Sequence, residues 1–210
     1  DIRNKQLSSH LTPLPESYTA LHGHTTHLTV ADKNGMVVSL TQTIGTTMGS
    51  KVATPGLGFM YAQTLGGYLG EVKPGDRAPS HISPIIVSRE GKPFLALGAA
   101  GGSRIPSSIV SVISRVIDQN LSLADAMSKP RVHPANDKIE LEIVQENENL
   151  YNENFDYSLS DTLFFSQRGH SAKLRSGKGN FGRVYALMRE GNEWVAVSDP
   201  DWQGSSGAVK

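Results

Sequence analysis

A pair of threonines at positions 25 and 26 is the clearest candidate for nucleophilic chemistry in the chain. A threonine hydroxyl is a weak nucleophile, and it becomes reactive when a base lies beside it. The free α-amine of an N-terminal threonine is such a base, because its pKa is about 8. Exposing the amine of Thr25 requires cleavage of the His24–Thr25 bond, where an irregular stretch gives way to a predicted strand. Threonines are also common in strands simply because they are β-branched, and this interpretation stays open.

A second candidate is the glycine-rich run at residues 98–104, which reads G-A-A-G-G-S-R. It lies between a predicted strand and a predicted helix. Consecutive glycines let a backbone approach a ligand closely, and exposed N–H groups at such a turn can face an anion. The run lacks the lysine of a P-loop and the spacing of a dinucleotide-binding fingerprint. It indicates an anion-binding turn or, as an alternative, only a tight connection from strand to helix.

Two further patterns suggest chemistry that the rest of the sequence does not support. Residues 177–184 fit the glycine-loop pattern of protein kinases, but no H-R-D or D-F-G motif follows them. His22, His24 and His27 are spaced like metal ligands, yet His24 and His27 would point to opposite faces of a strand. We therefore expect no nucleotide, no metal and no other cofactor.

The overall composition excludes several classes of function. The 210 residues carry 20 basic and 20 acidic side chains, so a polybasic surface for nucleic acid or anionic lipid is not expected. The absence of cysteine excludes a disulfide scaffold, a zinc ribbon and a cysteine nucleophile. No apolar run reaches the roughly 18 residues of a membrane span. The length suits one domain or a large piece of one.

Local patterns predict paired antiparallel strands with segregated helices, which is an α+β class without regular βαβ alternation. Asn34-Gly35 between two alternating stretches is a strong hairpin signal. Predicted strands cover residues 25–31, 36–43, 83–88, 94–97, 138–144, 172–175, 183–188 and 194–197, and predicted helices cover 106–119, 122–127 and 160–168. Residues 44–79 form a long Gly- and Pro-rich stretch of the kind that is often functional.

Several of these motifs together resemble the small subunit of γ-glutamyltranspeptidases. They occur in the same order as in that family, over about residues 25–200, and several motifs in register are far more specific than one. The matching segments are T-T-H-L-T-V at 25–30, R-A-P-S-H-I-S-P at 77–84, G-G-S-R-I at 101–105, P-R-V-H at 130–133 and S-D-P at 198–200.

The resemblance implies an N-terminal-nucleophile hydrolase with a four-layer αββα sandwich and a precursor that cuts itself before a threonine. The implied nucleophile is Thr25, and Thr43 matches the threonine that orients it. Gly101 and Gly102 match the pair whose backbone forms the oxyanion hole, which agrees with the glycine turn inferred above. Ser80 matches the first of two serines that hold the α-carboxylate of the acyl donor.

Four positions depart from the pattern of that family. His81 stands where the family has the second carboxylate-binding serine. Gly45, Thr64 and Gly67 replace an asparagine, an acidic or amide residue and an aspartate that bind the α-ammonium of a γ-glutamyl donor. Because an ammonium group in a pocket needs charged or polar acceptors, we expect an amidohydrolase or acyltransferase with altered donor specificity.

The same resemblance divides the chain into residues 1–24, a tail of the large subunit before the cleavage site, and residues 25–210, the catalytic small-subunit domain. It implies a heterodimer with the large subunit of the same precursor, a small γ-glutamyl-like amide as substrate, water or an amine as acceptor, and a periplasmic or extracellular location. The alternative is a catalytically inactive homologue that serves as a binding module.

Overall fold

The computed structural model describes residues 25–46, 48–64, 73–75, 80–135, 138–143, 157–176, 180–201 and 204–208. Residues 1–24 and Gly67 lie outside this part, as do residues 177–179 of the kinase-like glycine loop and residues 77–79. The strands are β1 (Thr25–Ala31), β2 (Val37–Thr43), β3 (Ile85–Arg89), β4 (Lys92–Ala100), β5 (Val132–Ala135), β6 (Lys138–Ile143), β7 (Ser171–Ser176), β8 (Arg183–Glu190) and β9 (Glu193–Ser198). The helices are η2 (Gly102–Arg104), α2 (Ile105–Ile117), α3 (Leu123–Ser128) and α4 (Leu159–Ser166).

Strands β1 and β2 form the predicted antiparallel hairpin, with Thr25 paired to Thr43 at its open end. The Asp32 carboxylate accepts hydrogen bonds from the backbone N–H groups of Asn34 and Met36, at 2.9 and 2.8 Å. Gly35 has a φ of 89°, which a glycine adopts without strain. Local turn chemistry therefore fixes the register of this hairpin.

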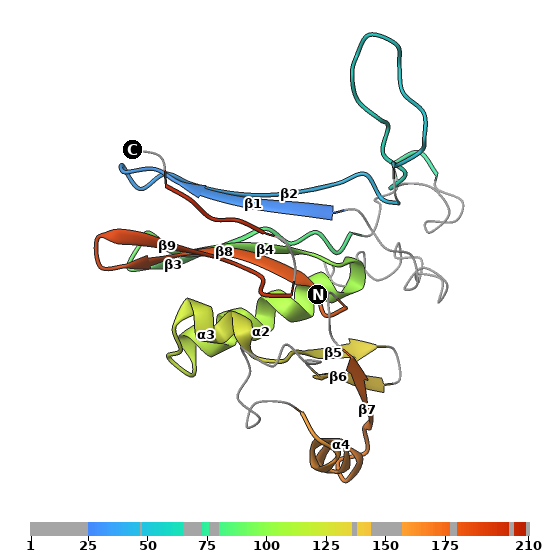
Figure 1. The fold of residues 1–210 in the computed structure, drawn as a ribbon, viewed down its shortest axis with the longest axis vertical. Helices are drawn as coiled ribbons and strands as arrows, with labels where there is room; N and C mark the ends of the chain where they lie inside the picture. Colours follow the sequence, from blue (N-terminus) through green and yellow to red (C-terminus); the bar gives the residue numbers. More distant parts are fainter. Residues whose placement is uncertain are drawn as a thin grey trace.

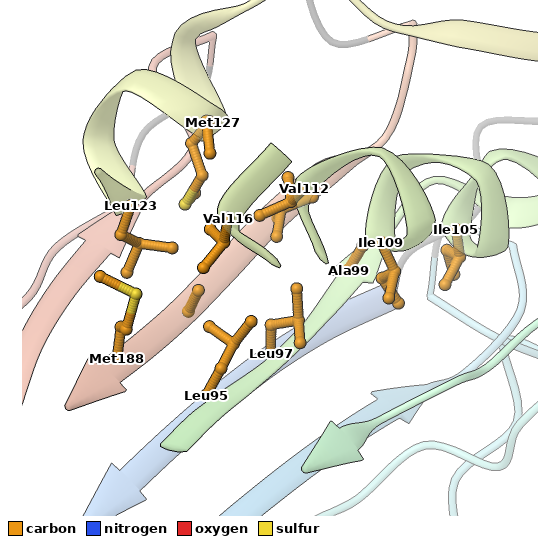
Figure 2. Close-up of a cluster of buried hydrophobic side chains, with 13 residues drawn as sticks. Leu95, Leu97, Ala99, Ile105, Ile109, Val112, Val116, Leu123, Met127 and Met188 are labelled. Atoms are coloured by element: carbon orange, nitrogen blue, oxygen red, sulfur yellow. The ribbon is translucent and has the colours of Figure 1, made fainter. Parts of the chain in front are cut away.

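The largest sheet has the order β3-β4-β8-β9, and all of its neighbouring strands are antiparallel. From Leu95 onward, every residue of β4 is buried. Its core side chains pack beneath α2 and α3 in the cluster of Figure 2, formed by Leu95, Leu97, Ala99, Ile105, Ile109, Val112, Val116, Leu123, Ala126, Met127, Val184, Ala186 and Met188. The apolar stripe predicted on α2 from its i, i+3 and i+4 spacing faces this core.

The layers follow the order hairpin, sheet, helices (Figure 1). The β1–β2 hairpin lies on one face of the β3-β4-β8-β9 sheet, and α2 and α3 cover the other face. The described residues thus supply two β layers and one α layer of an αββα sandwich. The outer face of the hairpin leaves Leu28, Val30, Val38 and Leu40 between 39% and 55% exposed. In the described part of the chain, no helix has the length and apolar character needed to cross a membrane.

A third sheet, of order β5-β6-β7, extends below the helices and differs from the expectation in two ways. Strands β6 and β7 are parallel and are joined through α4, so the described strands include a parallel pair where antiparallel pairing was expected. Strand β5 was not predicted, because it is only four residues long and contains Pro134. Proline is tolerated there because β5 is an edge strand.

Candidate active site

The two threonines at the open end of the hairpin are in direct contact. Thr25 is the first residue of β1 and Thr43 is the last residue of β2. The Oγ1–H of Thr25 donates a hydrogen bond to Oγ1 of Thr43 over 3.1 Å, and the same oxygen accepts the N–H of Gly45, also at 3.1 Å. The rotamer of Thr25 is thus tied to a neighbour that is itself tied to the backbone.

The glycine turn follows directly from the buried end of β4. Gly101 has a φ of 140° and Gly102 a φ of 61°, both in the region that favours glycine. A Cβ atom on Gly101 would lie 2.8 Å from the Cα of Gly182, so the two backbones approach closely there. The chain then forms η2 and enters α2, where Pro106 occupies the first turn as predicted.

Strand register brings these segments to one end of the stacked sheets. Ile85 pairs with Leu97, so the residues before β3 run back beside the end of β4. Strand β1 runs antiparallel to β4, because His27 meets Gly98 while Ser39, the cross-strand partner of Thr29, donates a hydrogen bond to the carbonyl of Leu97. The start of β1 and the end of β4 therefore lie at the same end (Figure 1).

Ser80 and His81 precede β3 in this region. Ser80 is exposed, and its hydroxyl accepts the N–H of Ile82 at 3.2 Å. The carbonyl of His81 accepts the hydroxyl of Ser83 at 3.0 Å. Burial lowers the pKa of His81 below its usual value, which favours the neutral ring at neutral pH. A neutral imidazole can both donate and accept a hydrogen bond, as a serine hydroxyl can.

Position 45 cannot carry a side chain in this backbone. Gly45 has a φ of 85°, and a Cβ there would lie 2.5 Å from the carbonyl oxygen of Gln63. Thr64 follows Gln63 and is half-buried. The side-chain carbonyl of Gln63 accepts the hydroxyl of Thr46 at 2.8 Å. None of these positions presents a carboxylate.

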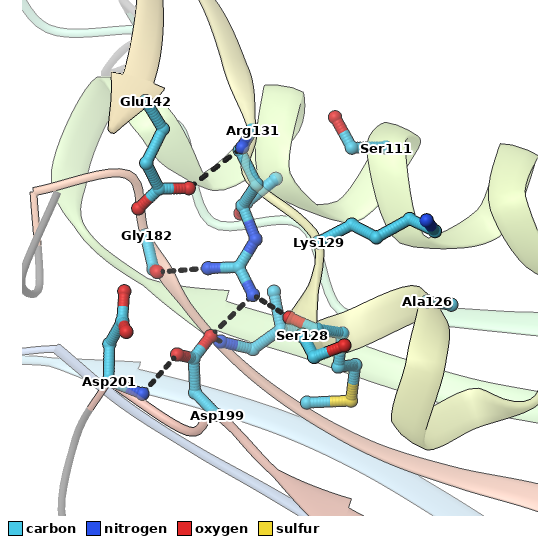
Figure 3. A network of polar contacts seen from close by, with 12 residues as sticks. Ser111, Ala126, Ser128, Lys129, Arg131, Glu142, Gly182, Asp199 and Asp201 are labelled. Atoms are coloured by element: carbon cyan, nitrogen blue, oxygen red, sulfur yellow. Dashed lines mark hydrogen bonds and ion pairs between the residues drawn. The ribbon is translucent and has the colours of Figure 1, made fainter. Parts of the chain in front are cut away.

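A buried ion pair of Arg131 and Asp199 lies beside Gly182 (Figure 3). The Nη2 of Arg131 lies 2.7 Å from Oδ2 of Asp199, and the two side chains are 3% and 0% exposed. The Nη1 of Arg131 donates to the carbonyl of Gly182 at 2.7 Å. Because Gly182 is in turn the residue that Gly101 touches, Arg131 supports the glycine turn through one backbone contact.

Sequence reasoning missed this support. Arg131 and Asp199 were noted only as parts of the family-like motifs, and Gly182 only as the last glycine of the kinase-like pattern. A Cβ on Gly182 would lie 2.6 Å from Oγ of Ser108, and its φ is 85°. Gly182 could thus have been picked out from the glycine pattern of the sequence, but a glycine is needed at this position because of close packing.

Glu142 completes the same network. Its Oε2 accepts the backbone N–H of Arg131 at 2.7 Å, and the residue is buried. Burial raises the pKa of Glu142 to about 7, and the nearby Arg131 only partly opposes this effect. Burial opposes the charge of Arg131, but Asp199 and Glu142 outweigh it and raise the pKa of Arg131.

A second polar cluster follows the glycine turn along the chain. Arg104 and Arg175 both donate to the Glu140 carboxylate at 2.8 Å. Burial opposes ionisation of Glu140, but these bonds outweigh it and lower its pKa to about 2. The Nδ1 of His133, the cross-strand partner of Glu140, lies 2.9 Å from the hydroxyl of Ser107. Burial and Arg104 lower the pKa of His133 to about 4.

Only one of the three histidines with metal-like spacing lies in the described part of the chain. His22 and His24 lie outside it, and His27 is buried against Thr41. Across the described ranges, no group of three or more His, Cys, Asp or Glu side chains is placed to hold a metal ion.

Comparison with known proteins identifies the family. The sequence profile described as Gamma-glutamyltranspeptidase matches residues 2–209. The chain belongs to the γ-glutamyltranspeptidase family. The resemblance drawn from the motifs is thereby confirmed. This family member is 28% identical to a glutathione hydrolase proenzyme of Pseudomonas aeruginosa, over 95% of the chain and 37% of that protein.

This γ-glutamyltranspeptidase family member also matches a protein named as an acylase and a solved structure. It is 39% identical to the Acylase ACY 1 proenzyme of Pseudomonas sp. strain V22, over 56% of the chain and 22% of that protein. It matches the structure of γ-glutamyltranspeptidase from Pseudomonas nitroreducens with a TM-score of 0.68 and 30% identity, over 88% of this chain and 100% of that one. The fold prediction is confirmed, and the chain spans about a third or less of these curated relatives.

Proposed function

We propose that the chain is the catalytic small-subunit part of a γ-glutamyltranspeptidase-like amidohydrolase or acyltransferase. The observation that carries the proposal is the hydrogen bond from Thr25 to Thr43 at the end of the sheets where the Gly101–Gly102 turn also lies. In this proposal residues 1–24 are the tail of the large subunit and residues 25–210 the small-subunit domain. The family membership supports this division.

The proposed chemistry begins with cleavage of the His24–Thr25 bond. In the uncut chain the nitrogen of Thr25 belongs to an amide, which is not a base. Cleavage converts it to an α-amine that can take the hydroxyl proton as the Thr25 oxygen attacks the donor carbonyl. The amine leaving group then departs with that proton, and the acyl group remains as an ester on Thr25. Water or an acceptor amine attacks this ester and restores the free threonine.

The remaining site residues have matched roles in the proposal. Thr43 holds the Thr25 oxygen in the orientation needed for attack, as their 3.1 Å contact supports. The backbone N–H groups of Gly101 and Gly102 stabilise the oxyanion of the tetrahedral intermediate, a contribution of roughly 3–4 kcal/mol for each donor. Ser80 and His81 bind a carboxylate of the donor. No step requires a cofactor.

The donor in this proposal lacks an α-ammonium group. Steric contact with Gln63 keeps Gly45 free of any side chain, and Thr64 offers only a neutral hydroxyl. An ammonium group placed there would lose its water without gaining an anionic partner. The 39% identity to a protein named as an acylase is in keeping with such a change. The substrate is then an amide of a dicarboxylic acid.

The partner in this proposal is the large subunit of the same precursor. The apolar outer face of the β1–β2 hairpin, made by Leu28, Val30, Val38 and Leu40, is the surface that it covers. Burying such a face is the ordinary way in which a β layer of a sandwich is completed. A periplasmic or extracellular location is part of the proposal through the family alone.

Mass spectrometry of the full-length precursor tests the proposal. We expect a small-subunit fragment that begins at Thr25, an acyl adduct on that residue during turnover, and an uncut chain in Thr25→Ala. Two separate subunits from Thr25→Ala would refute the nucleophile. An uncut wild-type chain after long incubation would favour the inactive homologue, which the changes at Gly45 and Thr64 otherwise suggest.

A matched pair of substrates tests donor specificity. The p-nitroanilides of γ-glutamate and of glutarate differ only by the α-ammonium group. We expect the glutaryl compound to have the higher kcat/KM, because it brings no charge that needs an acceptor. A preference for the γ-glutamyl compound would contradict the altered specificity while leaving the role of Thr25 intact.

A further inference from the structure

The imidazole of His27 occupies the space that a side chain would take on Gly98. His27 lies on β1 and is only 6% exposed. A Cβ on Gly98 would lie 2.3 Å from Cε1 and 2.4 Å from Nδ1 of the ring. Carbon atoms do not approach this closely, so glycine at position 98 is required for the ring to sit there. At this point the hairpin and the sheet are in direct contact, ring against backbone.

One hydrogen bond fixes the orientation of this ring. The Nδ1 of His27 lies 2.7 Å from Oγ1 of Thr41, its cross-strand partner on β2. The Nε2 is buried without a hydrogen-bond partner among the described residues. Burial lowers the pKa of His27 to about 4, so the ring is neutral at neutral pH. The ring acts through its shape and one bond, because it carries no charge.

The position of this contact connects the two halves of the candidate site. Thr25 is two residues before His27 and therefore shares its face of β1. Gly101 is three residues after Gly98, at the end of β4. Thr25 and the glycine turn belong to different sheets, and the His27–Gly98 contact lies close to both of them along the chain. Any shift of the hairpin across β4 at this contact moves Thr25 relative to the turn.

We propose that His27 is a positioning residue whose ring, seated on Gly98, sets the placement of Thr25 against the Gly101–Gly102 turn. This inference rests on the proposed function, since it assumes that Thr25 and the turn act on one carbonyl group. A displacement of about 1 Å between reacting groups can reduce the rate about a hundredfold. The ring therefore governs kcat while leaving the donor-binding residues unchanged.

The experiment uses the full-length processed enzyme and a double-mutant cycle. Gly98→Ala adds a methyl group where the ring lies, so we expect kcat to fall ten- to a hundredfold with KM changed less than threefold. His27→Ala removes the ring, and we expect a similar loss. In the double variant the new methyl group fills part of the vacated space, and we expect kcat to recover at least fivefold relative to Gly98→Ala.

A control variant separates positioning from general stability. Gly91 lies in the β3–β4 turn with a φ of 75° and no atom within 4 Å of an added Cβ. Gly91→Ala strains the backbone of the same sheet far from Thr25, so we expect a lower Tm with kcat unchanged. Should Gly98→Ala fail to fold, the kcat of His27→Ala decides the question alone, since that change creates space and no clash.

Two results would overturn the inference. One is an unchanged kcat in a processed Gly98→Ala or His27→Ala enzyme, and the other is a double variant whose losses simply multiply. Either result is distinct from a failure of the proposed function, in which the wild-type precursor itself shows no cut before Thr25 and no acyl adduct.

Discussion

Removal of the Arg131 guanidinium should destabilise the protein strongly and also slow it. In Arg131→Met the Asp199 carboxylate, which is fully buried, loses its cationic partner. Breaking a buried ion pair from one side costs about 3–5 kcal/mol. Asp199 keeps the N–H groups of Val184 and Asp201, at 2.8 and 3.1 Å, so we expect a loss near 3 kcal/mol.

The effect on rate follows from the second contact of Arg131. Its Nη1 no longer holds the carbonyl of Gly182, and Gly182 is the neighbour against which Gly101 packs. A small shift of the glycine turn misplaces the proposed oxyanion donors, so we expect kcat to fall about tenfold in the folded and processed enzyme. KM should change less, because no contact among the described residues joins Ser80 or His81 to this network.

Urea unfolding of the full-length protein measures the loss of stability, with all variants compared in the same processing state. The matched control is Arg168→Met, which removes an exposed guanidinium 3.5 Å from the centre of the Phe164 ring. An exposed cation–π contact contributes only about 0.5–1 kcal/mol. If Arg131→Met is no more destabilising than Arg168→Met, the reasoning about the buried pair is refuted.

Three further predictions concern pH, packing and orientation. Burial raises the pKa of Glu142 to about 7, so the contribution of Glu142 to stability falls as pH rises from about 4.5 to 7. Glu142→Gln should therefore gain roughly 3 kcal/mol relative to wild type over that range in urea titrations, and a difference that stays constant with pH would contradict this. Gly182→Ala should lower Tm through contact with Ser108, and Ser108→Ala should restore part of the loss. Thr43→Ala should reduce kcat at least tenfold in steady-state assays, whereas Thr43→Ser should retain the wild-type kcat. Equal kcat values for Thr43→Ala and the wild type would exclude the orienting role.

Most of the secondary structure was predictable because its causes are local. The Asn34-Gly35 turn, the alternating strands beside it and the apolar stripe of α2 each depend on residues within a few positions of one another. The parallel pairing of β6 with β7 was missed, because pairing partners are chosen by packing between segments that are far apart. Strand β5 was missed because Pro134 breaks the usual pattern of a strand.

The residues of the candidate site were likewise predictable only where their causes are local. Thr25, Thr43 and the Gly101–Gly102 turn could be named from the sequence, because motif order and residue type are local properties. The charges of Arg131 and Asp199 gave no indication of burial, since most ion pairs lie at the surface. Their role emerges only where the end of β9 and the start of β5 meet beside Gly182.

The sequence by itself thus indicated the family, most of the elements in their order and the threonine proposed as nucleophile. Only the tertiary structure decided that Thr25 contacts Thr43, that Gln63 leaves no space for a side chain at position 45, and that the ring of His27 rests on Gly98. The physical reason is that propensity and turn chemistry act over a few residues. Close packing, in contrast, joins residues from separate strands, and a difference of one methyl group decides whether they fit.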